Sequence, residues 1–134
     1  MHINLRENHA NKLRRAILGN AIFSGLSGAL IILAEPLVVA WLGVPEISIW
    51  PVGAGLLLFS AYLFWMGQST KLPGALVKGV ILGDWAWVAG TAVLLLLKAQ
   101  LFSGFGVFLL LDIAIVVAIF AILQAQGLKK VTAS

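Results

Sequence analysis

The sequence predicts an all-α membrane protein, a bundle of four transmembrane helices with a short interfacial segment between the first two. Two observations carry this prediction. The chain of 134 residues is 61% hydrophobic and only 10% charged, with a mean hydropathy of +1.05, whereas soluble domains carry about 25% charged residues. Its apolar residues gather in four long runs, at about 16–34, 49–67, 74–97 and 104–123. Each run has about the 20 residues that a helix needs to cross about 30 Å of hydrocarbon.

Little of the chain lies outside these four runs. Residues 1–15 form a polar tail, expected in the cytoplasm, three short connections join the runs, and residues 124–134 follow the last one. None of these segments is long enough for a soluble domain, so residues 1–134 are predicted to form a single membrane domain whose main partner is the lipid bilayer. Cysteine is absent, which excludes disulfides, thiolate metal ligands and cysteine nucleophiles.

The basic residues predict the orientation of the helices. The chain has nine Lys and Arg residues and a formal net charge of +4. If it crosses the membrane four times, only Lys98 falls on the side opposite the termini. The other basic residues all fall on the terminal side: Arg6, Lys12, Arg14, Arg15, Lys71, Lys78, Lys129 and Lys130. Because cytoplasmic segments carry the excess of Lys and Arg, we expect a bacterial inner-membrane protein with both termini in the cytoplasm. The positive charge thus reflects topology and does not indicate nucleic acid as a partner.

The connection between the first two runs is the most irregular segment. Pro36 follows Glu35 and should end the first helix, because proline lacks a backbone N–H and disfavours helix in the residue before it. Residues 37–45 are apolar but too short to span the membrane. We expect a short interfacial helix here, with Trp41 and Trp50 at the depth of the lipid headgroups. A lid over an outward-facing cavity is the functional alternative.

The polar tail has the pattern of an amphipathic helix. Residues 2–15 place Leu5 and Leu13 among the apolar positions and turn arginines toward anionic lipid, so a separate interfacial helix is predicted before the first span. His2 and His9 are the only histidines. Both precede the spans, so a haem held by two histidines inside the bundle is not expected. No metal site and no cofactor are predicted.

Small residues recur at helix-packing spacing in two of the predicted helices. Such rows let two backbones approach closely, and this contact holds helices together in lipid. The rows lie in the first and the third span: Ala21, Gly25 and Ala29 beside Ser24 and Gly28, and then Gly79 and Gly83 followed by Ala86 and Gly90. They are interpreted as packing within the bundle. Self-association of the chain through one row is the alternative.

Two carboxylates lie inside predicted spans, where a charge exposed to lipid costs a few kcal/mol. Asp84 is about 9 Å deeper than Lys78 at 1.5 Å per residue, which places it in the cytoplasmic half of the third span. Asp112 lies about 12 Å in from Gly104, toward the outer half of the fourth. Each carboxyl group is therefore expected to face the bundle interior, to accept hydrogen bonds or to carry a proton.

Sorting the polar side chains by depth predicts an intramembrane polar site with two levels. The inner level contains Asn20 and Asp84, which occupy matching positions in a short repeat formed by residues 14–20 and 78–84. The other candidates lie toward the outer side or between the levels: Ser27, Ser60, Tyr62, Thr91 and Asp112. Asn20 and Asp84 are interpreted as a hydrogen-bonded clasp between helices. A proton or ligand site and a contact with a partner subunit are the alternatives. Trp85 and Trp87, beside the inner level, either fill the core or line a ligand site.

The chain lacks the motifs of an enzyme. No Ser–His pair and no cluster of metal ligands lies within the spans, and carboxylates at two depths cannot share one acid–base step. In its hydropathy outline, including the proline-containing connection after the first helix, the whole chain resembles small bacterial four-helix membrane proteins of unassigned function, among them DoxX-type proteins. It is also similar to small multidrug transporters in length and span number, but those have a carboxylate in the first helix where this chain has Asn20.

These observations predict a non-catalytic accessory or scaffold subunit that acts through helix–helix contacts, as a homo-oligomer or within a larger membrane complex. The main alternative is a small proton-linked transporter that uses Asp84 and Asp112. A third interpretation is a subunit of a membrane enzyme that binds a quinone-like lipid at Trp85 and Trp87.

Overall fold

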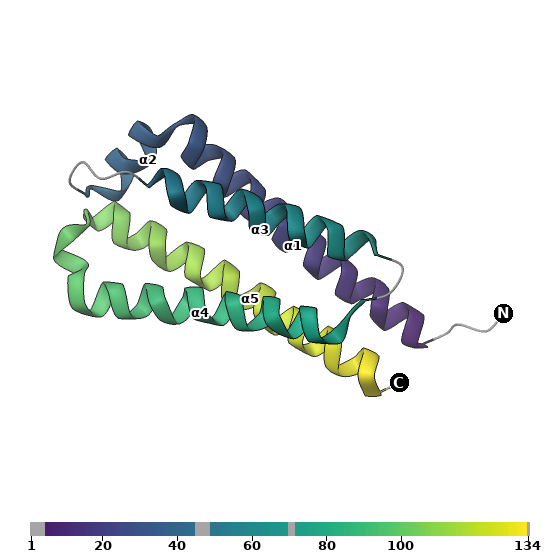
Figure 1. Cartoon of the computed structure of the whole chain (residues 1–134). Helices are drawn as coiled ribbons and strands as arrows, with labels where there is room; N and C mark the ends of the chain where they lie inside the picture. The colour runs from purple at the N-terminus through teal and green to yellow at the C-terminus, as the bar shows by residue number, and fades with distance from the viewer. Residues whose placement is uncertain (1–4, 45–48, 70–71, 134) are drawn as a thin grey trace.

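The computed structural model describes residues 5–44, 49–69 and 72–133 and shows a bundle of helices (Figure 1). Every regular element in these ranges is helical. Four helices are long and apolar enough to cross a membrane, so the predicted all-α bundle is confirmed. The elements are α1 (Leu5–Leu33), α2 (Glu35–Leu42), α3 (Trp50–Gln68), α4 (Gly74–Lys98), the 3-10 turn η1 (Ala99–Leu101) and α5 (Gly104–Ala133).

Helix α1 begins earlier than its apolar run predicts. It is helical without a break from Leu5 to Leu33, so residues 5–15 continue the first span and do not form a separate interfacial helix. Leu13 accounts for this difference, because its side chain is fully buried and packs over Gly127 of α5. Tertiary packing of this kind stabilises a helix more than local propensity does. Residues 2–4 of the predicted amphipathic helix lie outside the described residues.

Helix α5 likewise continues past its predicted end at residue 123 and reaches Ala133. Its buried positions recur at alternating steps of three and four residues, the spacing of a coiled-coil seam. These positions are Ala114, Val117, Ala121, Gln124 and Leu128. Packing of α5 on the bundle therefore continues beyond the purely apolar part of the sequence.

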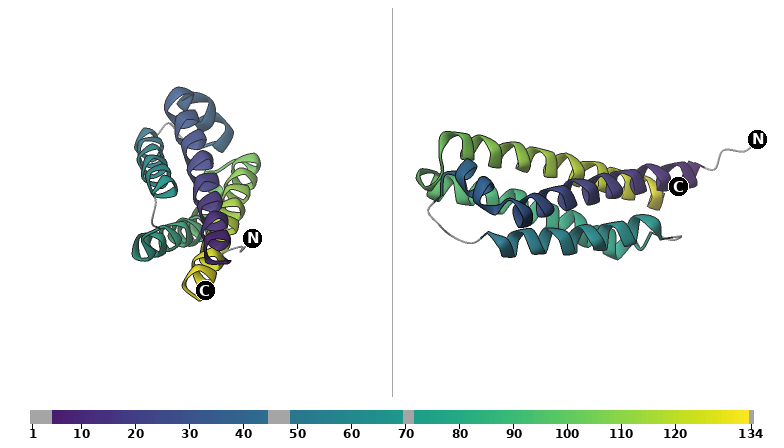
Figure 2. Two further views of the ribbon diagram at one scale, coloured as in Figure 1. Left: turned by 90° about the vertical axis from the view of Figure 1, so that its right-hand side faces the viewer. Right: turned by 90° about the horizontal axis from the view of Figure 1, so that it is seen from above.

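Helix α1 is the central helix of the bundle. Seen from above in Figure 2, it runs between α3 on one side and α5 on the other, and α4 packs on α5. The contact between α1 and α3 depends on small residues, as predicted for the row in the first span. A Cβ atom on Gly28 would lie 2.8 Å from the carbonyl oxygen of Gly53. Nearby, the Ser60 hydroxyl donates a hydrogen bond of 2.6 Å to the carbonyl of Ala21.

The small-residue row of α4 does not pack within the chain, which corrects the interpretation made for it from the sequence. Gly79, Gly83, Ala86 and Gly90 are all exposed. A Cβ atom built on any of these three glycines meets no atom of another helix within 4 Å among the described residues. The reason is the rotation of α4 about its own axis, which turns a different face toward the bundle. The buried residues of that face are Val77, Val80, Asp84 and Thr91.

A short helix follows the first span, as the proline predicted. Pro36 lies in the first turn of α2, where a missing N–H costs nothing. Gly43 ends α2 with φ of 71°, a left-handed conformation that glycine adopts without strain. The Ser103 amide donates to the Leu42 carbonyl at 2.9 Å. A side chain at Gly106 would collide with this same carbonyl, so α2 is docked closely on the start of α5.

The two ends of the bundle differ in character. The start of α1 and the end of α5 lie at one end, and α2 lies at the other (Figure 1). Trp41 and Trp50, predicted at headgroup depth, are both exposed in the segments near the α2 end. Lys98 ends α4 on that side, whereas the described basic residues of α1 and α5 lie toward the terminal end. Lys71 lies outside the described residues.

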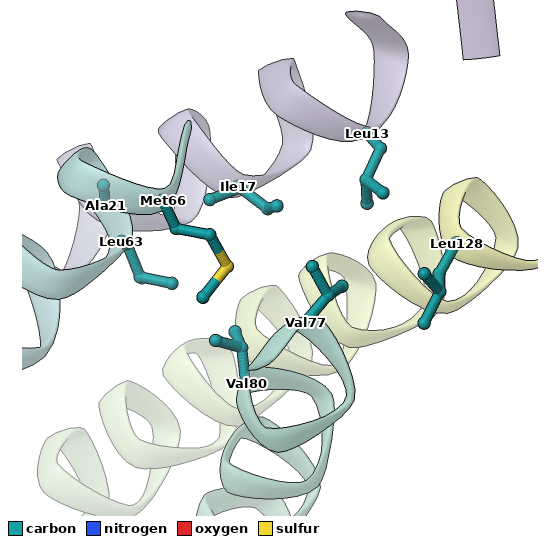
Figure 3. Packing of buried hydrophobic residues seen from close by; sticks show 8 residues of the cluster. All are labelled: Leu13, Ile17, Ala21, Leu63, Met66, Val77, Val80 and Leu128. Carbon is teal, nitrogen blue, oxygen red and sulfur yellow. The ribbon is translucent and has the colours of Figure 1, made fainter. Parts of the chain in front are cut away.

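An apolar core occupies the half of the bundle nearest the termini. Figure 3 shows its eight residues, which come from all four long helices: Leu13, Ile17, Ala21, Leu63, Met66, Val77, Val80 and Leu128. Arg14 lies beside this core. Its guanidinium donates to the carbonyls of Gly67 (3.3 Å) and Ser69 at the end of α3, where a cation satisfies helix-terminal carbonyls and complements the helix dipole.

Candidate functional site

A buried group of polar side chains joins α1, α4 and α5. The Asn20 amide donates hydrogen bonds to Asp84 Oδ2 at 2.9 Å and to Gln124 Oε1 at 3.1 Å. The Gln124 amide donates to the same Asp84 oxygen at 2.8 Å. Ser24 extends the group along α1 by donating to Asn20 Oδ1 at 3.3 Å. We call Asn20, Ser24, Asp84 and Gln124 the polar cluster.

Each member of the polar cluster is placed by the buried face of its own helix. Asn20 and Ser24 lie one turn apart on the side of α1 that also carries Ile17. Asp84 shares the buried face of α4, and Gln124 lies in the seam of α5. Asp84 is 3% exposed and Gln124 is fully buried. Because three helices contribute, the hydrogen bonds fix their relative rotation as well as their separation.

The polar cluster pairs amide donors with oxygen acceptors. One Asp84 oxygen accepts two amide donors, and both amide hydrogens of Asn20 have acceptors. Polar groups inside a membrane bundle face one another because lipid offers them no partner. Within residues 5–44, 49–69 and 72–133, no group of three His, Cys, Asp or Glu side chains is placed to hold a metal ion.

The predicted inner level is thus assembled, but the outer level is not. Ser60 is buried against α1 through its bond to the Ala21 carbonyl, and Thr91 is buried on α4. Tyr62 lies on the exposed side of α3, where its ring is 6.0 Å from that of Trp65. No hydrogen bond joins these three side chains to one another among the described residues.

Asp112 does not join the polar cluster. Its side chain is exposed on α5 and does not face the bundle interior, which was one of the three possibilities that the sequence left open for it. It precedes Gln124 by twelve positions, which is about 18 Å along a helix. Hydropathy gives the depth of a residue but not its direction around the helix axis, and this accounts for the difference.

The two tryptophans beside Asp84 also point outward. Trp85 is 39% exposed and Trp87 is 36% exposed, so neither fills the core of the described chain. They flank the polar cluster in sequence only. A quinone-like ligand held between them would lie on the surface of α4 and not within the bundle.

Two members of the polar cluster, Ser24 and Gln124, were missed from the sequence. Gln124 falls just beyond the apolar run at 104–123 that predicts the fourth span. The signal that finds it is the spacing of Val117, Ala121, Gln124 and Leu128, which continues a seam across the end of that run. Ser24 was interpreted only as a small packing residue, although it follows Asn20 by one helical turn.

No protein-family model, curated protein or solved structure matches this chain. Its class is therefore defined by the fold and by the polar cluster. Four helices are long and apolar enough to cross a membrane, and buried polar side chains of three of them hydrogen-bond one another. The protein is an integral membrane protein of the helical-bundle class.

Proposed function

We propose that the protein is a non-catalytic accessory or scaffold protein that associates with another transmembrane helix through the small-residue face of α4. This face consists of Gly79, Gly83, Ala86 and Gly90. The other helix belongs to a second copy of the chain or to a partner protein. The proposed setting is a bacterial inner membrane.

One observation carries the proposal, the contrast between two similar rows of small residues. The row in α1 makes its close contacts within the chain, since Gly28 packs on Gly53 and Gly25 packs on Ser60. The row in α4 has the same spacing, but a Cβ atom built on any of its glycines has no neighbour from another helix within 4 Å in the described chain. Such spacing allows close backbone contact between helices in lipid.

The composition of the α4 face supports a protein contact over plain exposure to lipid. Glycine in a helix interior is less favourable than alanine by about 1 kcal/mol. It also offers lipid less apolar surface than leucine, which occupies many other exposed positions of this helix. Three glycines on one exposed face therefore destabilise the isolated chain, and a helix packed closely against them offsets that loss.

Enlarging the α4 face tests this proposal. Gly83→Leu is expected to abolish association in mild detergent while leaving the unfolding midpoint in SDS at or slightly above the wild-type value, because its new side chain meets no other helix of the described chain and leucine favours the helix more than glycine does. Gly55→Leu is the matched control, since Gly55 is an exposed glycine of α3 with equally open surroundings. Light scattering should show only the Gly83 variant at the mass of a monomer, whereas wild type and the Gly55 variant remain associated. The proposal would be refuted if wild-type protein were already monomeric and free of a partner, or if both variants lost association equally.

The proton-linked transport interpretation has less support. It needs a path that connects both carboxylates, whereas Asp84 is buried against two amides and Asp112 is exposed on α5, about 18 Å along that helix from Gln124. The polar cluster is better suited to hold three helices in fixed positions, which is what a scaffold requires.

We further propose that both termini face the cytoplasm, because eight of the nine basic residues then do so. The chain has no cysteine, so single cysteines report their own accessibility. In intact cells, a membrane-impermeant thiol reagent should label Gln100→Cys, in the exposed η1 turn, and spare Ala133→Cys at the end of α5. The reverse pattern would contradict this orientation.

A further inference from the structure

A pocket of about 350 Å³ lies between the first turns of α1 and the last turns of α5. It is distinct from the polar cluster and from the α4 face. The two helices approach closely beside it, since a Cβ atom on Gly127 would lie 3.0 Å from the Cβ of Leu13. Both helix ends extend beyond their predicted spans, so the pocket belongs to the part of the fold that hydropathy did not reveal.

The polar part of the pocket is cationic. Lys12 and Arg15 lie one helical turn apart on α1, and Lys130 lines the pocket from α5. None of the described residues that line it is acidic. Cations that converge in this way attract a phosphate group, and arginine adds paired donors for its oxygens.

His9 gives a second, independent indication of a ligand. It lines the pocket, and its Nδ1 atom is buried with no hydrogen-bond partner in the described part of the chain. Buried polar atoms in native proteins are nearly always hydrogen-bonded, so an orphaned one calls for an explanation. A polar ligand in the pocket supplies the missing partner.

The rest of the lining is apolar and lies deeper in the bundle. Phe120 and Leu123 belong to the hydrophobic part of α5, and Leu123 is seven residues, about 10 Å along the helix, from Lys130. The pocket therefore changes from cationic to apolar along the direction of the helices. This gradient matches a molecule with an anionic head and a hydrocarbon tail.

We propose that the pocket binds an anionic phospholipid. Its phosphate contacts Lys12, Arg15 and Lys130, with His9 beside it, and the start of an acyl chain lies against Phe120 and Leu123. Basic pockets at the ends of transmembrane helices recognise lipid headgroups by this chemistry. The pocket lies at the end of the bundle that holds both termini, and the inference does not depend on association through α4.

Native mass spectrometry tests the proposal with purified protein equilibrated in equimolar phosphatidylglycerol and phosphatidylcholine. Wild-type protein should retain phosphatidylglycerol in preference. The double variant Lys12→Gln/Arg15→Gln should weaken its retention on the order of 30-fold, from the usual contribution of each cation near an anionic lipid. Both side chains are exposed, so the SDS unfolding midpoint should stay at the wild-type value.

The matched control is Lys78→Gln/Lys129→Gln, which removes the same charge from exposed positions that do not line the pocket. It should retain phosphatidylglycerol as wild type does. Equal loss of phosphatidylglycerol retention in both double variants would show general electrostatic attraction and would overturn the proposal. The proposal would also be overturned if wild-type protein had no preference for the anionic lipid. A further arm adds inorganic phosphate alone. Binding of phosphate that depends on Lys12 and Arg15, without preference for phosphatidylglycerol, would assign the pocket to free phosphate and overturn the lipid assignment.

Discussion

Replacing Gly28 with leucine is expected to force α1 away from α3 and to lower the free energy of unfolding by about 2–3 kcal/mol. A Cβ atom at this position would lie 2.8 Å from the Gly53 carbonyl oxygen and 3.1 Å from side-chain atoms of Leu56 and Leu57. The nearest of these is a backbone atom, which cannot rotate out of the way. Titration with SDS in mixed micelles measures the change.

The control for Gly28→Leu is Gly55→Leu. Position 55 has no atom of another helix within 4 Å of a built Cβ among the described residues, so leucine there should leave the unfolding free energy unchanged or raise it slightly through better helix propensity. A Gly28 variant as stable as the Gly55 variant would mean that α1 and α3 do not pack as closely as the structure has them.

Replacing Asp84 with leucine is expected to destabilise the bundle by about 1–2 kcal/mol, since two buried hydrogen bonds within a membrane protein are lost. Asn20 and Gln124 would keep their mutual bond, and Asn20 would keep the bond from Ser24, but both would lose their acceptor on α4. Asp84→Asn should remain close to wild type, because the asparagine oxygen can still accept from both amides. Unfolding in SDS measures both variants side by side.

The two Asp84 variants also distinguish a structural role from transport. If Asp84 carried protons, wild-type protein would support proton-coupled flux in proteoliposomes, and Asp84→Asn would fold normally yet lose that flux. If the polar cluster is structural, wild type and Asp84→Asn behave alike in that assay. Equal destabilisation by asparagine and by leucine would contradict the hydrogen-bond account, because asparagine keeps an oxygen that can accept from both amides whereas leucine has none.

The number of helices and their approximate ranges could be predicted because hydrocarbon thickness sets the length of an apolar run. Pro36 predicted the break after α1 and the short helix that follows, because the constraint is local to the backbone. The ends of α1 and α5 could not be predicted in this way. They extend because Leu13 packs against α5, a contact between residues far apart in sequence.

The inner part of the candidate site could be predicted from depth, and its composition only in part. Asn20 and Asp84 lie at matching depths and meet through a hydrogen bond. Gln124 joins them from beyond the apolar run, and Asp112 turns outward although it lies well within a span. Depth follows from counting residues, whereas the rotation of a helix depends on which of its faces finds a partner. That choice is made by packing among all four helices.

The same limit applies to the two rows of small residues. Both have the spacing that favours close helix contact, and the sequence does not distinguish them. In the structure, Gly28 of the first row packs on α3, whereas Gly83 of the second faces outward. The difference between these two rows is the central feature from which the function is inferred.

Photo-crosslinking from α4 in native membranes tests that inference most directly. The cysteine-free chain accepts a thiol-reactive benzophenone at Leu82→Cys, an exposed position next to Gly83 that leaves the small-residue face intact, with the exposed Leu58→Cys on α3 as the matched position. We predict that irradiation yields a discrete protein adduct from position 82, at the mass of two chains or of one chain and a partner, and none from position 58. No adduct from position 82, or the same adducts from both positions, would contradict association through the α4 face.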